Sequence, residues 1–147
     1  MLDLFKMPLG SQIFSDTKLV SRDDLVRYAA ASGDFNPIHY RDDFARAVGL
    51  PGVICHGMLT MALAIAPLMT QLGTDVSRLS SYGVRFSKPV PVPVGKNPLD
   101  EQSVGALLSI KAFLRKREDS KAIIELNVSL DDETVLTKAF AEISLKI

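Results

Sequence analysis

Residues 58–72 read MLTMALAIAPLMTQL, a stretch without a single Asp, Glu, Lys or Arg. A helix that is apolar on all sides must be surrounded by protein or lipid. This one falls short of the roughly 20 residues that cross a bilayer as a helix, and its length of about 22 Å matches the width of a sheet of several strands. We therefore expect a central helix buried against a sheet and kinked or ended at Pro67, with its methionines packed in the core rather than binding a cofactor.

Segments on both sides of this helix indicate the sheet. Apolar and β-branched sequence occupies residues 11–20, 80–87, 104–115, 122–130 and 135–147. Polar breaks at 117–120 and 131–133 separate the last three segments, as hairpin turns would. The second half of the chain is therefore expected to form consecutive antiparallel strands.

Two shorter helices are expected before the central one. Ser21 and Asp24 have the spacing of a capping box, and Gly33 is a natural helix stop, which predicts a helix over residues 22–32. Residues 42–48 form a second, short amphipathic segment. Helices in the first half and antiparallel strands in the second predict the α+β class, with a sheet wrapped around one long helix in a single domain, residues 1–147.

The composition excludes several classes of protein. With 47% hydrophobic and 23% charged residues among 147, the chain is not disordered and is long enough to bury a core. Lys plus Arg and Asp plus Glu both number 17, so the basic excess typical of nucleic-acid-binding domains is missing. A single cysteine, Cys55, cannot form an intrachain disulfide, and the N-terminus is a poor signal peptide. We expect a cytoplasmic protein with no membrane insertion and no nucleic-acid partner.

His39 and His56 are the only histidines, which narrows the search for an acid–base site. Asp34 precedes His39 by five positions, and five residues of regular helix would turn the two side chains about 140° apart. Gly33 and Pro37 stand where a turn is needed to bring them to the same side. Such a carboxylate–imidazole pair can hold and activate one water, because a histidine passes protons near neutral pH. The alternative interpretation is a surface aspartate beside a histidine bonded to backbone.

Gly57 follows His56 at the start of the central helix. The first N–H groups of a helix have no internal partners and lie at the positive end of its dipole, and glycine allows close approach to the backbone. A carbonyl oxygen placed there would be polarised as in an oxyanion hole. The alternatives are close helix packing for Gly57 and a structural role for His56.

Other reactive sites are not expected. The side chains of Cys55 and His56 are adjacent and diverge in an extended segment, which disfavours a Cys–His nucleophile. Two histidines and one cysteine make a poor zinc site. Four cations flank an expected hairpin turn: Arg115, Lys116, Arg117 and Lys121. We interpret them as solvated charges, and the alternative is a landing patch for an acidic or phosphorylated carrier.

Three of these segments together resemble a known family. Residues 30–39 (AASGDFNPIH), 56–59 (HGML) and 82–90 (YGVRFSKPV), with Ala45 between the first two, resemble the MaoC-like, or (R)-specific enoyl-thioester hydratase, family. The sequences of these segments most resemble those of the single-hotdog 3-hydroxyacyl-thioester dehydratase subunits of actinobacteria. The resemblance covers nearly the whole chain. It implies the hotdog fold, an antiparallel sheet wrapped around a long central helix. It also implies a homodimer or heterodimer of such subunits with the acyl chain in a tunnel at the interface.

The resemblance further implies reversible hydration of a trans-2-enoyl thioester to an (R)-3-hydroxyacyl thioester in fatty acid metabolism. Asp34 and His39 match the catalytic pair. Asn36 matches the residue that shapes the loop between them, and Gly57 matches the backbone donor to the thioester carbonyl, so both are expected on the substrate side of the site. No metal or redox cofactor is implied. The acyl group would be carried by coenzyme A or by acyl carrier protein.

Two departures from the family pattern leave alternatives open. Family hydratases often place a serine on the central helix near the catalytic pair, whereas residues 62–66 contain none. Many relatives have Gly-Asp where residues 95–98 read GKNP. One rival function is a thioesterase, which would need an acid on or near the central helix, and residues 58–72 contain none. The other is a hotdog subunit of a heteromeric acyl-carrier-protein dehydratase, inactive alone or serving mainly to bind the acyl chain.

Overall fold

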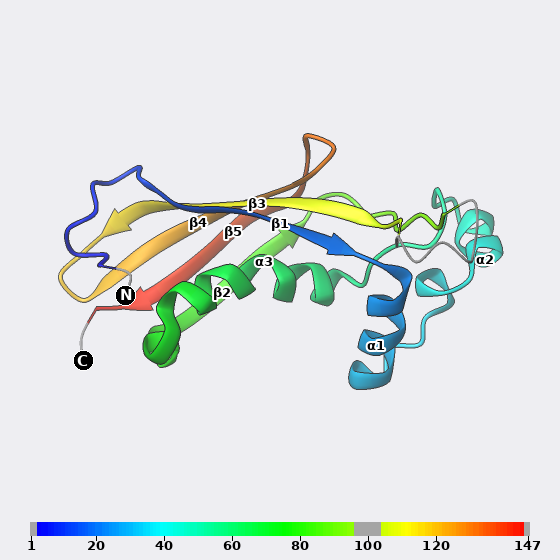
Figure 1. The fold of residues 1–147 in the computed structure, drawn as a ribbon, viewed down its shortest axis with the longest axis horizontal. Coiled ribbons are helices and arrows are strands. Elements are labelled where there is room, and N and C mark those ends of the chain that lie inside the picture. Colours follow the sequence, from blue (N-terminus) through cyan, green and yellow to red (C-terminus); the bar gives the residue numbers. More distant parts are fainter. Residues whose placement is uncertain (1–2, 96–103, 146–147) are drawn as a thin grey trace.

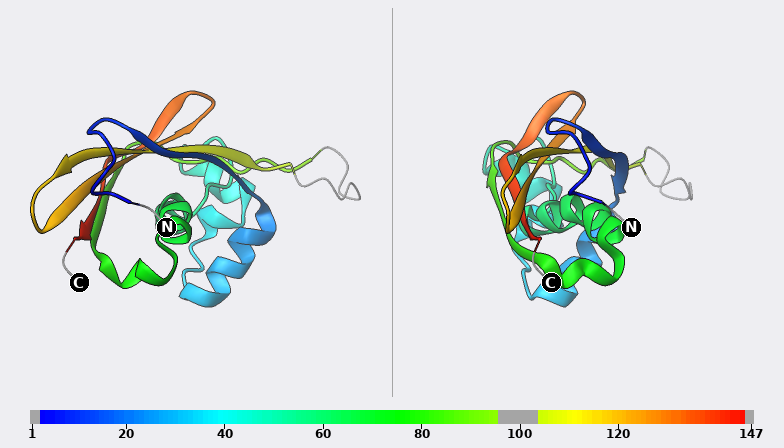
Figure 2. Two further views of the ribbon diagram at one scale, coloured as in Figure 1. Left: turned by 60° about the vertical axis from the view of Figure 1, so that its left-hand side comes forward. Right: turned by 90° about the vertical axis from the view of Figure 1, so that its left-hand side faces the viewer.

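The computed structural model describes residues 3–95 and 104–145. Within them, a five-stranded antiparallel sheet with the order β1-β3-β4-β5-β2 curves over a central helix (Figures 1 and 2). The strands are β1 (Gln12–Val20), β2 (Leu79–Phe86), β3 (Ala106–Arg117), β4 (Lys121–Leu130) and β5 (Glu133–Ser144). Each begins and ends within a few residues of its predicted segment, so the predicted α+β architecture is confirmed. Positions 96–98 of the GKNP segment and the predicted strand end at 146–147 lie outside the described residues.

The core lies on the concave face of the sheet. Buried and more exposed residues alternate along β3, as they do in a sheet with one face packed and one face toward water. The inward-facing side chains of β3 and β4 are almost wholly buried: Leu108, Ile110, Ala112, Leu114, Ala122, Ile124, Leu126 and Val128. This apolar layer is the surface on which the central helix packs.

The central helix α3 spans Gly57–Leu72 and lies across the concave face (Figure 2). Its buried residues are Thr60, Ala64, Ile65, Leu68 and Leu72. Pro67 lies inside the helix and does not end it. Of the two expectations for Pro67, an end of the regular helix is therefore wrong, and a kink stays a prediction. A proline in a helix interior costs about 3 kcal/mol, and burial of the apolar side chains on both sides of Pro67 offsets that cost.

The expectation that protein surrounds α3 on all sides is not met within this chain. Met58 and Met69 are 56% and 40% exposed, so two methionines predicted for the core lie on the surface. The reason is geometric, because the sheet covers one face of α3 and no second layer formed by residues 3–95 and 104–145 covers the opposite face. Together with the 3-10 segment η2 (Gly73–Arg78), which was not predicted, α3 forms a helical stretch of 22 residues. That stretch is long and apolar enough to cross a membrane by length and composition alone, a test that core helices of soluble domains also pass.

Three short elements gather where α3 begins (Figure 1). Helix α1 (Arg22–Ser32) starts with the predicted capping box, in which the Ser21 side chain accepts from the Asp24 N–H and the Asp24 side chain accepts from the Ser21 N–H. Gly33 ends α1 in the left-handed conformation, with a φ of 76°. The predicted turn contains a single 3-10 turn, η1 (Pro37–His39), and α2 (Asp42–Ala47) follows.

Strand β5 contains a bulge that was not predicted. Lys138 has a φ of 50°, and the register shifts beside it in both the β2–β5 and the β4–β5 pairings. An extra residue in one strand bends that strand and changes which side chains it directs inward. Leu136, two residues before Lys138, is 2% exposed and lies in the cavity described below.

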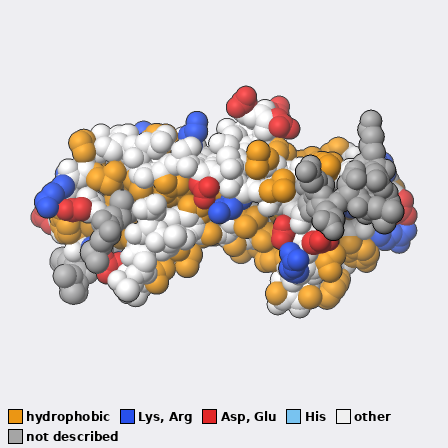
Figure 3. Space-filling view, viewed as in Figure 1, with side chains coloured by type: hydrophobic (Ala, Val, Ile, Leu, Met, Phe, Trp, Pro, Cys, Tyr) orange, Lys and Arg blue, Asp and Glu red, His pale blue; other side chains and the backbone are white. Residues whose placement is uncertain are grey.

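The four cations near the β3–β4 turn form ion pairs or hydrogen bonds with other residues of the domain. Lys116 pairs with Glu118, Lys121 pairs with Glu142, and Arg115 pairs with Glu125. Arg117 donates to the carbonyl oxygens of Leu4 and Met7, both at 2.8 Å, and so anchors the N-terminal segment. This turn lies at the opposite end of the molecule from α1 and α2 (Figure 1), and acids and cations are interspersed over the face in Figure 3. The geometry favours a structural interpretation of these charges over a landing patch.

Candidate active site

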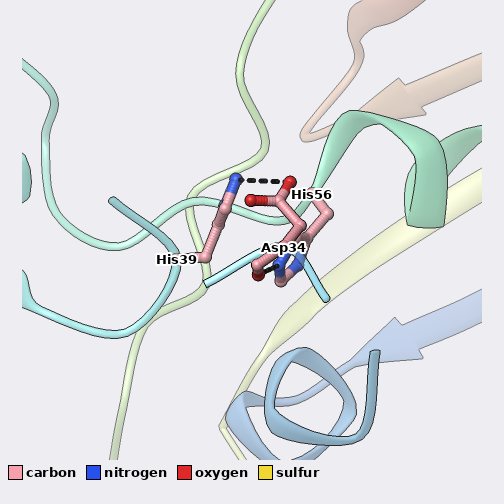
Figure 4. A group of neighbouring side chains, drawn as sticks. All are labelled: Asp34, His39 and His56. Carbon is pink, nitrogen blue, oxygen red and sulfur yellow. Dashed lines mark hydrogen bonds and ion pairs between the residues drawn. The ribbon is translucent and has the colours of Figure 1, made fainter. Parts of the chain in front are cut away.

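The structure brings Asp34 and His39 together through the turn expected between Gly33 and Pro37. The loop between α1 and η1 turns back on itself, and Oδ2 of Asp34 lies 3.9 Å from Nε2 of His39 (Figure 4). The His39 side chain is 8% exposed and that of Asp34 is 50% exposed. A buried imidazole thus faces a carboxylate that solvent can reach.

Hydrogen bonds within the loop fix the direction of the carboxylate. The Asn36 N–H donates to Oδ1 of Asp34 at 3.2 Å, which leaves Oδ2 toward His39. The Asp34 N–H donates to Oγ of Ser32, also at 3.2 Å. The side-chain oxygen of Asn36 accepts from the Ile38 N–H and caps η1, with Pro37 as its first residue. Asn36 therefore shapes this loop through both its backbone and its side chain.

His39 is held in one tautomer by the backbone. Its Nδ1 lies 2.8 Å from the carbonyl oxygen of Ile54, and because a carbonyl can only accept, Nδ1 carries the hydrogen in the neutral ring. Nε2 then presents a lone pair toward Asp34. The Ile54 N–H in turn donates to the Ile38 carbonyl at 3.1 Å, which joins η1 to the segment before α3. The backbone-bonded histidine of the alternative interpretation is therefore present as well, through the other ring nitrogen.

His56 is the second histidine of the cluster and is 1% exposed. Its Nε2 donates to the backbone carbonyl of Asp34 at 3.1 Å, and its ring stacks on that of His39 with centroids 3.8 Å apart. Tyr28 contacts the ring as well, with centroids 4.8 Å apart and planes tilted by 57°. Burial is the main cause that lowers the pKa of His56 below its usual range.

Asp34, His39 and His56 each offer one possible metal-ligand atom, and these atoms lie within 4.8 Å of one another. A metal ion would have to compete for Nε2 of His56 with the Asp34 carbonyl, or reach Nδ1, which is enclosed by protein. The donor set fits a hydrogen-bonded histidine better than a metal ligand. The expectation of a site without a metal stays a prediction.

Gly57 is the first residue of α3 and lines a cavity of about 390 Å³ together with His39. As the first N–H of the helix, that of Gly57 has no partner inside the helix. A Cβ at this position would lie 3.2 Å from Cε1 of Phe86, so close packing, the alternative interpretation, also applies. The other cavity walls are mostly apolar: Ile38, Ile54, Phe86, Pro89, Val90 and Leu136.

Thr60 is a site residue that sequence reasoning missed. It is 2% exposed, lines the same cavity from α3, and donates its hydroxyl to the His56 carbonyl at 3.2 Å. The family pattern places its serine at positions matching residues 62–66, whereas the helix hydroxyl of this chain lies nearer the start of α3. Counting three positions from Gly57, the spacing of neighbours on one helix face, would have found it.

The Cys55 thiol also borders this cavity and is not set up as a nucleophile. Cys55 is 3% exposed and donates to the His56 carbonyl at 3.4 Å. Burial raises the pKa of the thiol to about 11, so the reactive thiolate is scarce at neutral pH.

Comparison with known proteins places this geometry in a family. The model of the MaoC like domain matches residues 6–95. The chain is 45% identical over 67 residues to 3-hydroxyacyl-thioester dehydratase X of Mycobacterium tuberculosis, a match that covers 46% of the chain and 22% of that protein. It is 29% identical over 121 residues to the 3-hydroxybutyryl-CoA dehydratase of Methylorubrum extorquens, a match that covers 81% of this chain and 69% of that protein.

Solved structures share the fold. A MaoC-like dehydratase superimposes with a TM-score of 0.84 at 26% identity, over 97% of this chain and 42% of that chain. A chain of the HadBC (3R-hydroxyacyl-ACP dehydratase) complex from Mycobacterium tuberculosis superimposes with a TM-score of 0.68 at 17% identity. That match covers 93% of this chain and 97% of the other. The latter match shows likeness of fold alone. The family model covers more than half of the chain, and the chain therefore belongs to the MaoC-like domain family.

Proposed function

We propose that this protein catalyses the reversible hydration of a trans-2-enoyl thioester to an (R)-3-hydroxyacyl thioester in fatty acid metabolism. The observation that carries the proposal is the placement of Asp34 and His39. At 3.9 Å, Oδ2 and Nε2 are too far apart for a direct hydrogen bond. Both atoms accept hydrogen bonds when His39 is neutral, so a water molecule that donates one hydrogen to each fits the gap.

The reaction uses these groups as acid and base. The thioester carbonyl oxygen rests on the Gly57 N–H, where the start of α3 stabilises the negative charge that develops on it. The water oxygen adds to C3 while His39, assisted by Asp34, takes the water's proton. Protonated His39 then delivers a proton to C2. One O–H bond of water and the C2=C3 π bond break, the C3–O and C2–H bonds form, and dehydration runs the same steps in reverse.

The active form is a dimer with a second hotdog subunit, either another copy of this chain or a different one. Two features support this. The face of α3 that carries Met58 and Met69 is exposed, and β2, which begins just after α3 and η2, is an edge strand of the sheet. An unpaired edge strand and an exposed apolar helix face both favour association. A heteromeric dehydratase, with this chain inactive alone, is the second candidate, and the named HadBC complex gives it a precedent within the fold.

The substrate is an acyl thioester of coenzyme A or acyl carrier protein. The matched segment spans less than a quarter of the length of the M. tuberculosis dehydratase X, so the substrate of that whole protein does not carry over directly. The apolar walls of the cavity beside His39 support an acyl chain there. We also propose that the protein acts in the cytoplasm and does not insert into a membrane.

The test is hydration of crotonyl-coenzyme A and of a longer trans-2-enoyl homologue by the purified chain. The oligomeric state is measured on the same sample by light scattering, and Asp34→Asn is the matched control. Hydration that is lost in Asp34→Asn supports a self-sufficient hydratase. A folded wild-type protein that hydrates neither substrate contradicts that form of the proposal. Activity that then returns with a second hotdog subunit, or with acyl-carrier-protein thioesters, favours the heteromeric dehydratase.

A further inference from the structure

We propose that His56 is a positioning residue for this reaction, because one buried side chain holds both members of the Asp34–His39 pair in place. Its Nε2–H fixes the backbone of Asp34, and its ring fixes the plane of the His39 ring. The inference rests on the proposed function and adds to it a residue that does not touch the substrate. His56 does not line the cavity that His39 and Gly57 share.

The first contact attaches an exposed loop to the core. The Asp34 side chain is 50% exposed, and its other hydrogen bonds, to Ser32 and Asn36, stay within the same loop. The bond from His56 reaches 22 positions along the chain and comes from a residue that is 1% exposed. It is therefore the hydrogen bond that ties Asp34 to the start of α3. A carbonyl only accepts, so His56 must carry its hydrogen on Nε2.

The second contact completes the constraint on His39. The bond from Nδ1 to the Ile54 carbonyl anchors one ring atom and leaves the ring free to rotate about that point. Stacking on His56, with centroids 3.8 Å apart and planes 22° apart, removes this freedom. Tyr28 contacts the His56 ring too. Nε2 of His39 then points in one direction, toward Oδ2 of Asp34.

His56 acts through its neighbours rather than as an acid or base. Its Nδ1 is buried and has no hydrogen-bond partner among the described residues, so a proton there would be a buried charge without an acceptor. That charge would also lie against the ring of His39. Burial lowers the pKa of His56 accordingly. A neutral ring enclosed by protein has no route for exchanging protons with a substrate.

Three substitutions separate the two contacts. His56→Gln keeps a side-chain N–H for the Asp34 carbonyl and loses the ring, His56→Phe keeps a ring and loses the donor, and His56→Leu loses both. A displacement of about 1 Å in a reacting group can cost on the order of 100-fold in rate. We therefore expect His56→Leu to lower kcat about 100-fold with KM nearly unchanged, and Gln and Phe to retain intermediate rates. Ile124→Val, a core change on β4, is the control for lost stability and keeps the wild-type kcat.

Rates are compared per folded molecule, with folding checked by thermal denaturation. A folded His56→Leu enzyme with the wild-type kcat overturns the inference and leaves the proposed function standing. Gln and Phe variants no faster than Leu overturn it as well, because neither contact would then restore the pair. A wild-type protein that hydrates no enoyl thioester with any partner overturns the proposed function instead.

Nuclear magnetic resonance gives a readout that does not depend on activity, because the chain has only two histidines. The ring nitrogen signals are expected to show Nε2–H for His56 and Nδ1–H for neutral His39. His56 should titrate at lower pH than a free imidazole, because burial lowers its pKa. A neutral His56 ring that carries its hydrogen on Nδ1 overturns the inference, because Nε2 could then not donate to the Asp34 carbonyl.

Discussion

The backbone N–H of Asn36 donates to Oδ1 of Asp34 at 3.2 Å, and this bond turns the second carboxylate oxygen toward His39. The same residue caps η1 with its side chain, which accepts from the Ile38 N–H. Asn36 thus couples the direction of the carboxylate to the short turn that carries the imidazole. These two bonds hold the carboxylate and the turn together from within the loop. The Ile54 carbonyl and the His56 ring then fix the loop to the segment before α3.

Replacing Asn36 by alanine should lower kcat by about fivefold, because losing an N-cap costs about 1 kcal/mol and a comparable loss in alignment of Asp34 is about a factor of five in rate. Asn36→Ser keeps a side-chain acceptor at the cap and should recover most of the rate. Both variants are compared by initial rates of enoyl-thioester hydration. Equal rates for Asn36→Ala and the wild-type enzyme would show that the cap does not align the carboxylate.

Much of this site follows from local sequence rules. The capping box at Ser21, the left-handed stop at Gly33 and the proline at the start of η1 are all short-range signals, and each is present as predicted. The approach of Asp34 to His39 follows from them, since the loop has few other ways to turn. The turn itself could be predicted from these local signals, whereas the bonds from Ile54 and His56 that hold the pair in place could not.

The features that were missed depend on distant contacts. The partners of His56 are Asp34 and His39, and nothing in its own neighbourhood indicates either of them. The bulge at Lys138 comes from the pairing of β5 with two strands at once, and lysine is not a residue that marks a left-handed position. The exposed side of α3 could not be foreseen either, because an apolar sequence shows that a face needs cover without showing which chain supplies it.

Lys138 has an exposed side chain and a φ of 50°, a conformation that costs an L-residue about 1 kcal/mol and costs glycine little. The backbone entropy that glycine loses on folding offsets part of the relieved strain, so Lys138→Gly should leave the free energy of unfolding unchanged or raise it by up to about 0.5 kcal/mol in urea titrations. Lys111→Gly is the matched control, because Lys111 is exposed in β3 and lacks a positive φ. That control should be destabilised by about 0.5–1 kcal/mol, because there glycine brings its entropic cost without relieving any strain. If both changes lower stability equally, the bulge does not strain Lys138.

The hydroxyl of Tyr82 is buried without a hydrogen-bond partner among the described residues. Leaving such a group unpaired costs about 1–3 kcal/mol, so Tyr82→Phe should raise the free energy of unfolding by about 1 kcal/mol. Tyr40→Phe, at a tyrosine that is 51% exposed, should leave stability unchanged. A loss of stability in Tyr82→Phe would indicate that a dimer partner hydrogen-bonds the hydroxyl, since Tyr82 lies on the edge strand β2.

Stability should fall at alkaline pH, and Cys55 accounts for part of the fall. Burial raises the pKa of its thiol from 9.0 to about 11, so the folded protein keeps a proton that the unfolded chain releases between those values. A state that binds more protons loses stability as the pH rises, so this contribution is complete below pH 9 and declines above it.

Between pH 8 and pH 10 the Cys55 contribution should decline by about 1 kcal/mol. Cys55→Ala lacks this titration, so its free energy of unfolding should fall less than that of the wild-type protein over the same interval, whatever its absolute stability. The comparison uses urea titrations at both pH values, and every other titrating group cancels in the difference. Burial also raises the pKa of Tyr82, so Tyr82→Phe is the matched variant for the second contribution. Parallel losses of stability in the wild type and Cys55→Ala would mean that the thiol ionises in the folded protein as readily as in the unfolded chain.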